Sequence, residues 1–170
     1  MKKIGIFYGS STGNTEQAAE LIAQKLEVDS SNVINVDKAK GAQLLDYDIL
    51  LLGSSTWGVG DLQDDWDGFI SNLQKQDLSG KEVGVFGSGD SASYSDSFCD
   101  ALGIIAEAAE KAGARIVGKG ADTADYSFDD SRAAIGGQFI GLPLDFDNED
   151  DKTEERVEQW ITRIKADCGL

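Results

Sequence analysis

The chain has 170 residues, of which 41% are hydrophobic and one is proline, so its length and composition suit one compact domain with a buried core. It has no histidine, the commonest general base and metal ligand, and this counts against hydrolases and metalloenzymes. The net charge of -16, from 15 basic and 31 acidic side chains, argues against nucleic acid or anionic membrane as partners and favours basic proteins.

The N-terminal residues lead straight into an apolar, strand-like run without a signal region, and no stretch is long and apolar enough to span a membrane. We therefore expect a cytoplasmic protein. The two cysteines, Cys99 and Cys168, form neither a Cys-x-x-Cys pair nor a metal-binding spacing. We interpret them as ordinary thiols and expect no metal site.

The first predicted strand, residues 3–8, leads into a hydroxyl-rich turn at residues 9–15 and then into an amphipathic helix. A turn between a strand and a helix presents free backbone N–H groups and the positive end of the helix dipole. No Lys or Arg occurs between Lys3 and Lys25, so the turn predicts a phosphate site built from neutral donors. The alternative is that these residues only form a turn and cap the helix.

The same turn does not match the common nucleotide-binding motifs. An ATP or GTP loop requires a lysine after its second glycine, whereas Gly9 and Gly13 are one residue too close and Asn14 follows them. Gly-x-Gly-x-x-Gly is also absent, which argues against a dinucleotide. We therefore expect the turn to hold a terminal phosphate and leave it unreacted.

Strand-like and helix-like segments then alternate along the chain. Further strands are predicted at residues 33–36, 49–53, 83–88 and 115–118. Helices are predicted where apolar residues recur three and four positions apart, at Ala18, Leu21, Ile22 and Leu26; Leu62, Trp66, Phe69, Ile70 and Leu73; Phe98, Leu102, Ile105 and Ala109; and Val157, Trp160, Ile161 and Ile164. This order predicts a parallel sheet covered by helices on both faces, with Trp66 and Trp160 in the core.

The segment at residues 119–137 does not follow the alternation. It is rich in Gly, Asp, Ser and Ala, and strand-like residues resume at 138–142. We expect an insertion that interrupts the fifth strand, either as an interaction surface or as a neutral addition.

Two further strand ends carry aromatic residues on loops of small residues. Trp57 lies in Gly53-Ser54-Ser55-Thr56-Trp57-Gly58-Val59-Gly60, and Tyr94 ends Gly87-Ser88-Gly89-Asp90-Ser91-Ala92-Ser93-Tyr94. In open parallel sheets, ligands bind at the carboxyl ends of the strands. A phosphate site beside two loop aromatics predicts a flat ring with a phosphorylated tail, and stacking between them suits an isoalloxazine. Each aromatic alone is as well explained as a loop anchor.

With these three motifs, the chain resembles the long-chain flavodoxins over its whole length. The resemblance implies a doubly wound α/β fold with a five-stranded parallel sheet in the order 2-1-3-4-5 and an insertion in the fifth strand. It also implies non-covalent FMN and a low-potential one-electron carrier that shuttles between semiquinone and hydroquinone, without enzymatic activity of its own. Donor reductases and electron-accepting enzymes with basic surfaces are the implied partners, and we expect a monomer.

By the same resemblance, residues 10–15 bind the phosphate, Trp57 and Tyr94 flank the ring, and the loops at Gly58 and at residues 88–97 meet its polar edge. The implied cofactor-binding residues are Ser10, Ser11, Thr12, Gly13, Asn14, Thr15, Ser55, Thr56, Trp57, Gly58, Val59, Gly60, Ser88, Gly89, Asp90, Tyr94, Ser97, Phe98 and Asp147. No catalytic side chain is implied, because the cofactor carries the chemistry.

The acidic loops predict how the protein sets the cofactor's potentials. One acid at about 10 Å disfavours an added negative charge by roughly 1–2 kcal/mol before screening, so several acids lower the potential of the second electron. Gly58 lacks a Cβ, so its peptide turns over easily to offer its carbonyl to the flavin N5 of the neutral semiquinone.

Two other protein classes share features with this chain. A receiver domain shares the sheet order but requires acids after the first strand and a phosphoacceptor aspartate after the third, where this chain has Gly-Ser-Ser and Gly-Ser-Ser-Thr-Trp. A flavodoxin-like NAD(P)H-dependent quinone or flavin reductase requires open space over the ring, which Trp57 and Tyr94 would obstruct. Hydride transfer from NAD(P)H would favour that second class.

Overall fold

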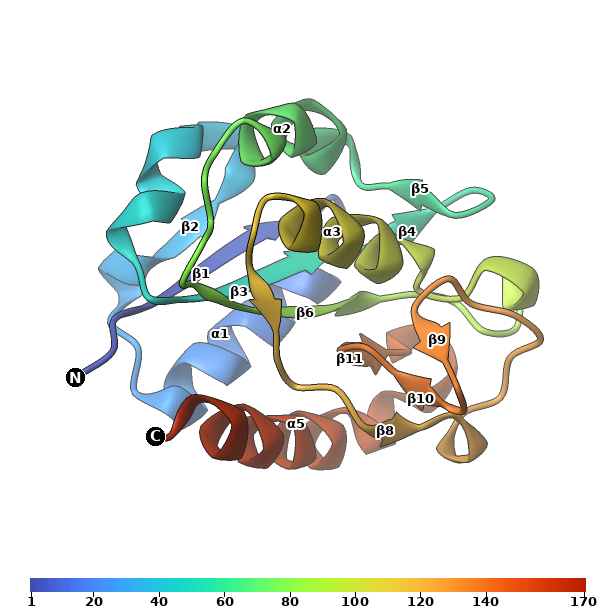
Figure 1. The fold of residues 1–170 in the computed structure, drawn as a ribbon. Coiled ribbons are helices and arrows are strands. Elements are labelled where there is room, and N and C mark those ends of the chain that lie inside the picture. The colour runs from blue at the N-terminus through green and yellow to red at the C-terminus, as the bar shows by residue number, and fades with distance from the viewer.

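The computed structural model describes residues 1–170 and has a parallel sheet at its centre (Figure 1). The strands lie in the order β2 (Val33–Asn35), β1 (Ile4–Gly9), β3 (Ile49–Ser54), β6 (Glu82–Ser88) and β11 (Leu142–Leu144), and β7 (Arg115–Ile116) also pairs with β6. Every pair in this sheet is parallel. The predicted α/β fold and its strand order are confirmed.

Helices cover both faces of this sheet. α1 (Asn14–Leu26) and α5 (Thr153–Cys168) lie on one face, and α2 (Asp64–Gln74) and α3 (Asp100–Lys111) on the other (Figure 1). The short helix α4 (Phe146–Glu149) follows β11. This two-faced cover is what short, fully buried parallel strands require.

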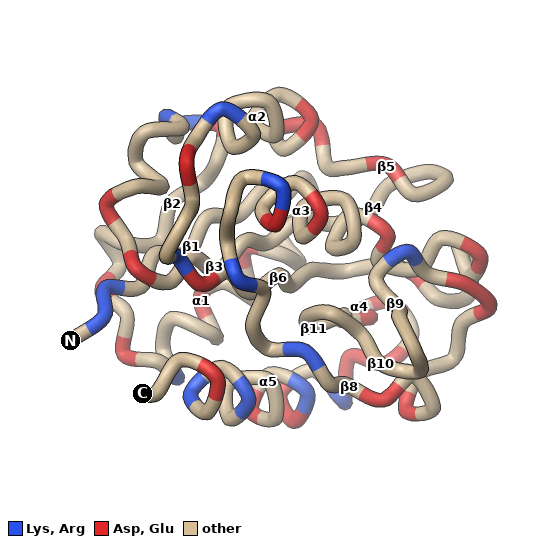
Figure 2. The backbone as a smooth tube through the Cα atoms, in the orientation of Figure 1, with Lys and Arg blue, Asp and Glu red and all other residues tan.

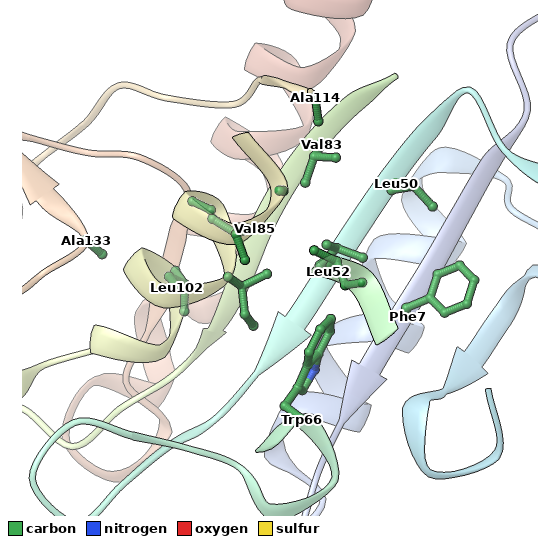
Figure 3. Packing of buried hydrophobic residues seen from close by; sticks show 14 of the residues in the cluster. Phe7, Leu50, Leu52, Trp66, Val83, Val85, Leu102, Ala114 and Ala133 are labelled. Atoms are coloured by element: carbon green, nitrogen blue, oxygen red, sulfur yellow. The ribbon is translucent and has the colours of Figure 1, made fainter. Parts of the chain in front are cut away.

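Each face has its own apolar core, because successive strand residues point to opposite sides of a sheet. In β3, Leu50 and Leu52 join the core under α2 and α3, whereas Ile49 and Leu51 join the core under α1 and α5. Figure 3 shows the first of these cores, with Trp66 beside Leu52.

Trp66 and Trp160 occupy the two cores, one on each face, and both are 0% exposed, as predicted. The indole N–H of Trp66 donates to the carbonyl oxygen of Gly53 at 2.6 Å. This bond fixes α2 against the end of β3, where the chain leaves the sheet.

The fifth strand is split into two halves that pair with different parts of β6. β7 pairs with Glu82 and Val83, and β11 pairs with residues 86–88. Between them, β8 (Ala121–Asp122), β9 (Ala134–Ile135) and β10 (Gln138–Phe139) form a small antiparallel sheet in the order β8-β10-β9. The expected interruption of the fifth strand is confirmed.

The point at which the fifth strand resumes was predicted wrongly. Residues 138–139 belong to the small sheet, and the main sheet resumes at Leu142. Phe139 is fully buried and packs against Phe98, Tyr126 and Phe128, so its apolar signal reflects this aromatic cluster. Alternating hydrophobicity alone does not tell which sheet a short strand joins.

The remaining elements are short. β4 (Thr56–Trp57) and β5 (Asp61–Leu62) form a hairpin after β3. Val36, predicted to end the second strand, instead begins a 3₁₀ turn at Val36–Lys38. Other 3₁₀ turns lie at Ser30–Asn32, Gly41–Asp46, Ser95–Ser97, Thr123–Asp125 and Asp150–Lys152. None of the helices combines the length and the apolar character that crossing a membrane would require.

Candidate functional site

The carboxyl ends of the central strands meet at one edge of the sheet, and the predicted site residues follow them. The register pairs Gly9 of β1 with Ser54 of β3, and Leu144 of β11 with Ser88 of β6. The segments at residues 10–13, 55–60, 89–98 and 145–148 therefore leave the sheet at the same edge, which is where parallel sheets bind ligands.

The loop after β1 leaves a set of backbone N–H groups without partners. These groups belong to Ser10, Ser11, Thr12, Asn14, Thr15 and Glu16, and none of them donates a hydrogen bond within the chain. The residue that precedes α1 is Gly13, with a φ of 94°, and no side chain caps the helix. Ser10 Oγ accepts the N–H of Gly13 within the turn, but no side chain caps the helix, and an anion would satisfy the free donors.

Buried hydrogen bonds tie this loop to its neighbours. Thr15 Oγ1 lies 3.3 Å from Ser88 Oγ, which joins α1 to the end of β6. Gln63, only 1% exposed, donates to Ser11 Oγ at 3.1 Å. The same side chain accepts the N–H groups of Asp65 and Trp66 at the start of α2. The geometry of this loop thus depends on contacts with α1, with the end of β6 and with Gln63 at the start of α2.

The hairpin after β3 presents Trp57 at the same edge. Trp57 is 42% exposed, and its indole N–H donates to Ser55 Oγ at 2.9 Å. Gly58 and Gly60 have φ values of 52° and 88°, in the left-handed region that favours glycine. The N–H groups of Gly58, Val59 and Gly60 have no partner in the chain, so they are free to meet a ligand.

Two buried contacts hold this hairpin against α3. Thr56 Oγ1 accepts the N–H of Ala101 at 3.1 Å. The side chain of Asp100 lies against Gly60 so closely that a Cβ added to Gly60 would lie 2.6 Å from Asp100 Oδ2. Asp100 Oδ1 accepts the N–H of Arg132, in the insertion, at 2.7 Å. Burial raises the pKa of Asp100 above its ordinary value.

The loop after β6 is organised by Asp90. Its Oδ1 accepts the N–H groups of Ala92 and Ser93, and Asn148 Nδ2 donates to it at 2.9 Å. The bond from the Ser93 N–H is the main reason that the pKa of Asp90 lies below its usual range. Tyr94 then projects from this loop with 46% of its surface exposed.

The end of the fifth strand adds an acidic group. Asp145 is 1% exposed, and it accepts the hydroxyl of Ser91 and the side-chain amide of Asn148. Partial burial raises the pKa of Asp147, and the neighbouring charges of Asp90 and Asp145 raise it further. Asp147 therefore lies near Asp90 of the loop after β6.

Two of the predicted residues lie beneath the loops. Ser97 is 5% exposed and Phe98 is 1% exposed. Phe98 packs in the aromatic cluster of the insertion, and its N–H already donates to Asp130 O. Phe98 therefore packs in the core beneath the loop, and its predicted contact with the cofactor stays a prediction.

Four further residues at this edge were not predicted from the sequence: Gln63, Asp100, Asp145 and Asn148. The strand-end rule that singled out the first, third and fourth strands also leads to Asp145 and Asn148 when it is applied to the fifth. Gln63 and Asp100 carry no such signal, because each acts through contacts between residues distant in sequence.

Neither cysteine is poised as a thiolate nucleophile, because burial favours the protonated thiol in both. Burial raises the pKa of Cys168 to about 11 and that of Cys99 well above its ordinary value. No group of His, Cys, Asp or Glu side chains could hold a metal ion. The fold and this edge define an α/β protein whose strand ends carry loops with free neutral donors and two exposed aromatics.

Comparison with known proteins identifies the family. The model of the flavodoxin family matches residues 6–160. The flavodoxin of Nostoc sp. strain PCC 7120 is 43% identical over 169 residues, 99% of each chain. Flavodoxin 1 of Escherichia coli K12 is 44% identical over 167 residues, covering 98% of this chain and 94% of that one.

Solved structures support the same family. The FMN-bound flavodoxin of Fusobacterium nucleatum has a TM-score of 0.91 and 31% identity, covering 98% of this chain and 99% of that one. Flavodoxin 2 of Bacillus cereus has a TM-score of 0.74 at 31% identity, covering 97% of this chain and 99% of that one. This chain belongs to the flavodoxin family, whose members are electron-transfer proteins rather than enzymes.

Proposed function

We propose that this protein is a one-electron carrier that binds FMN non-covalently and serves redox partner proteins. The observation that carries the proposal is the row of unpartnered N–H groups at residues 10–16, because a phosphate would accept hydrogen bonds from them. The flavodoxin of Fusobacterium nucleatum, which shares this fold, is bound to FMN. When bound, FMN supplies the one-electron chemistry, and the protein holds it and sets its potentials.

The residues at the site fit this group. The free N–H groups and hydroxyls of residues 10–15 would hold the phosphate. Trp57 and Tyr94, both exposed, would pack against the ring. The free N–H groups of residues 58–60 would meet the polar edge of the ring. The other proposed contacts are Ser55, Thr56, Ser88, Gly89, Asp90, Ser97 and Asp147.

We further propose that the second electron enters at low potential. Asp90, Asp145 and Asp147 lie close enough for their charges to influence one another, as the raised pKa of Asp147 indicates. The phosphate loop contains no positive side chain to offset added negative charge. At an effective dielectric constant near 20, each acid at about 10 Å disfavours the second electron by roughly 1–2 kcal/mol before screening.

The first test compares the binding of FMN and riboflavin to the protein freed of flavin, followed by flavin fluorescence. We expect FMN to bind at least about 100-fold more tightly, since a phosphate accepts several charge-assisted hydrogen bonds. Equal affinities would overturn the role of residues 10–16. Failure of both ligands to bind would overturn the proposed function.

The second test is anaerobic photoreduction of the FMN-loaded protein, followed by visible absorption. Two separated one-electron steps support a one-electron carrier, and a single two-electron step contradicts it. Addition of NADPH or NADH should not reduce the flavin rapidly without a reductase. Rapid reduction would favour the quinone or flavin reductase alternative, which family membership does not favour.

Flavodoxins work with redox proteins, and we propose that the partners of this one present basic surfaces. Figure 2 shows acidic residues on the loops near β5 and β9. Opposite charge raises the rate of encounter between such a surface and a basic protein. A single-domain, monomeric protein in the cytoplasm completes the proposal, and size-exclusion chromatography and cell fractionation check the oligomeric state and the location.

A further inference from the structure

The two exposed aromatics at the carboxyl edge of the sheet are held differently. Trp57 is 42% exposed and Tyr94 is 46% exposed. The hydroxyl of Tyr94 makes no hydrogen bond within the chain, whereas each of the other three tyrosines makes one. The indole N–H of Trp57, in contrast, donates to Ser55 Oγ at 2.9 Å. Trp57 is therefore the aromatic whose orientation is fixed by a polar contact.

The acceptor of this bond, Ser55, is itself held in place. It lies between β3 and β4 and is only 8% exposed. Its carbonyl oxygen accepts the hydroxyl of Ser54, a fully buried residue, at 2.8 Å. On its other side, Thr56 Oγ1 accepts the N–H of Ala101 in α3. The Ser55 hydroxyl makes no hydrogen bond in the chain other than the one with Trp57, so orienting this indole is its one role within the fold.

The course of the chain brings Ser55 and Trp57 to the same side. In an extended chain, residues two positions apart point to one side and the residue between them points to the other. Thr56 contacts α3, so Ser55 and Trp57 point away from that helix. Trp57 also pairs with Asp61 of β5, whereas the N–H groups of residues 58–60 have no partner. The indole is thus held at the fixed end of the hairpin, beside a tip whose backbone donors are free.

Fixing a half-exposed indole in advance favours the binding of a flat ring against it. Without a polar contact, an exposed side chain exchanges among several rotamers. A ligand that packs against it must then order it, and this ordering lowers the affinity. The indole N–H is the only polar group of tryptophan, so one hydrogen bond to a fixed acceptor is enough to restrain the plane of the ring.

We propose that Ser55 is a positioning residue, which acts on the cofactor through Trp57 by holding the indole in the orientation that packs against the ring. This role rests on the proposed function, because the ring is that of FMN. It gives the Ser55 side chain an indirect effect on binding, beside the contacts proposed above. Removal of the hydroxyl should weaken FMN binding about three- to tenfold, which is the net effect of one hydrogen bond.

The first measurement is the nitrogen-15 relaxation of the Trp57 indole in the full chain freed of flavin. We expect an order parameter near that of rigid backbone, about 0.85, in the original protein and below about 0.6 in Ser55→Ala. Trp66 and Trp160 are fully buried and serve as internal references, whose order parameters should be the same in both proteins. A Trp57 indole that is equally mobile in the two proteins would overturn the proposal.

The second measurement is the FMN dissociation constant of the original protein, Ser55→Ala, Trp57→Phe and the double variant. Phenylalanine keeps an aromatic face but has no N–H, so in the Trp57→Phe background the serine change should alter the affinity by less than about 1.5-fold. An equal loss of affinity in both backgrounds would overturn the proposal, since Ser55 would then act without Trp57. If Ser55→Ala does not fold, Ser55→Cys, which offers only a weak acceptor, gives the same comparison.

Failure of the positioning role and failure of the proposed function give different results. If the original protein does not bind FMN, the proposed function fails and the role of Ser55 fails with it. If the original protein binds FMN and Ser55→Ala binds it equally tightly, only the positioning role is overturned.

Discussion

Gly58 and Gly60 hold the loop after β3 in a backbone shape that other residues adopt only under strain. Their φ values of 52° and 88° place both in the left-handed region. Around Gly58 there is little obstruction, since an added Cβ would meet only Asp61 Oδ2, at 3.1 Å. At this position the requirement is therefore conformational, and the peptide that follows Gly58 is free to change direction.

Gly58→Val should narrow the gap between the two one-electron potentials of the bound flavin. A left-handed conformation costs a residue with a Cβ about 1–2 kcal/mol, equivalent to roughly 40–90 mV in a one-electron step. Spectroelectrochemical titration measures both potentials. Gly80→Val is the matched control, because Gly80 has a φ of 81° and open space around it but lies far from the site in the fold. Gly80→Val should lower the free energy of unfolding without changing either potential of the flavin. An unchanged gap between the two potentials in Gly58→Val would contradict the role of this peptide.

Asp100 should make the folded protein less stable as the pH rises. Burial raises its pKa in the folded state, so its contribution is fully present below the unfolded pKa and is lost as the pH rises through the folded pKa. Asp100→Asn keeps an oxygen that can accept the N–H of Arg132, so it should reduce this loss. Urea unfolding between about pH 4 and pH 7 measures the difference. A variant whose stability follows the same pH curve as the original protein would rule out Asp100 as the source.

At the scale of whole elements, the insertion is packed against the protein. Phe139 of β10 is 0% exposed and contacts Phe98, whose own neighbours include the start of α3. Phe98 directly follows the 3₁₀ turn at Ser95–Ser97 in the loop that carries Tyr94, so the aromatic cluster anchors the end of that loop. The insertion therefore contributes to the stability of the fold.

Phe139→Ala should lower the free energy of unfolding by about 3–5 kcal/mol, since it removes a large aromatic side chain from a filled core. Ile135→Ala in the neighbouring strand β9 is the control, because Ile135 is 68% exposed and should change stability by less than about 0.5 kcal/mol. Chemical denaturation provides both values. Similar losses in the two variants would mean that the cluster does not carry the stability of the insertion.

Helices and strands were predictable from the sequence where a single hydrophobic periodicity dominated the segment. Val157, Trp160 and Ile164 share one helix face, and all three are fully buried. The loop between β1 and α1 was likewise predictable, because its residues are contiguous in sequence, and its binding of phosphate stays a prediction. The position of β10 was not, since Phe139 serves a cluster assembled from distant segments. Gln63 escaped notice for the same reason, as its function depends on contact with Ser11 across 52 positions of sequence.

For the molecule as a whole, charge governs how it meets other proteins. The net charge of -16 gives any basic partner a favourable approach from a distance. Screening shortens that distance to about 10 Å at 0.1 M salt. Ionic strength should therefore affect the rate of association more than the rate of dissociation.

The association rate with a basic redox partner should fall at least about tenfold between low and physiological salt. Stopped-flow measurements over a salt series test this. Asp61→Asn, on the hairpin at the proposed contact surface, should reduce the rate at low salt. Glu110→Gln, an exposed change of the same charge at the far end of α3, should alter it less. A rate independent of salt would show that charge does not guide the encounter.

The divided fifth strand has a consequence for how copies of the protein avoid one another. An uncovered sheet edge is a template on which another chain can add a strand and begin to aggregate. Here the outer edge is broken into β7, with two residues, and β11, with three. β11 also holds Pro143, the one proline of the chain, which has no N–H to offer to an incoming strand. At the opposite edge β2 has three residues, so neither edge presents a long ladder for self-association.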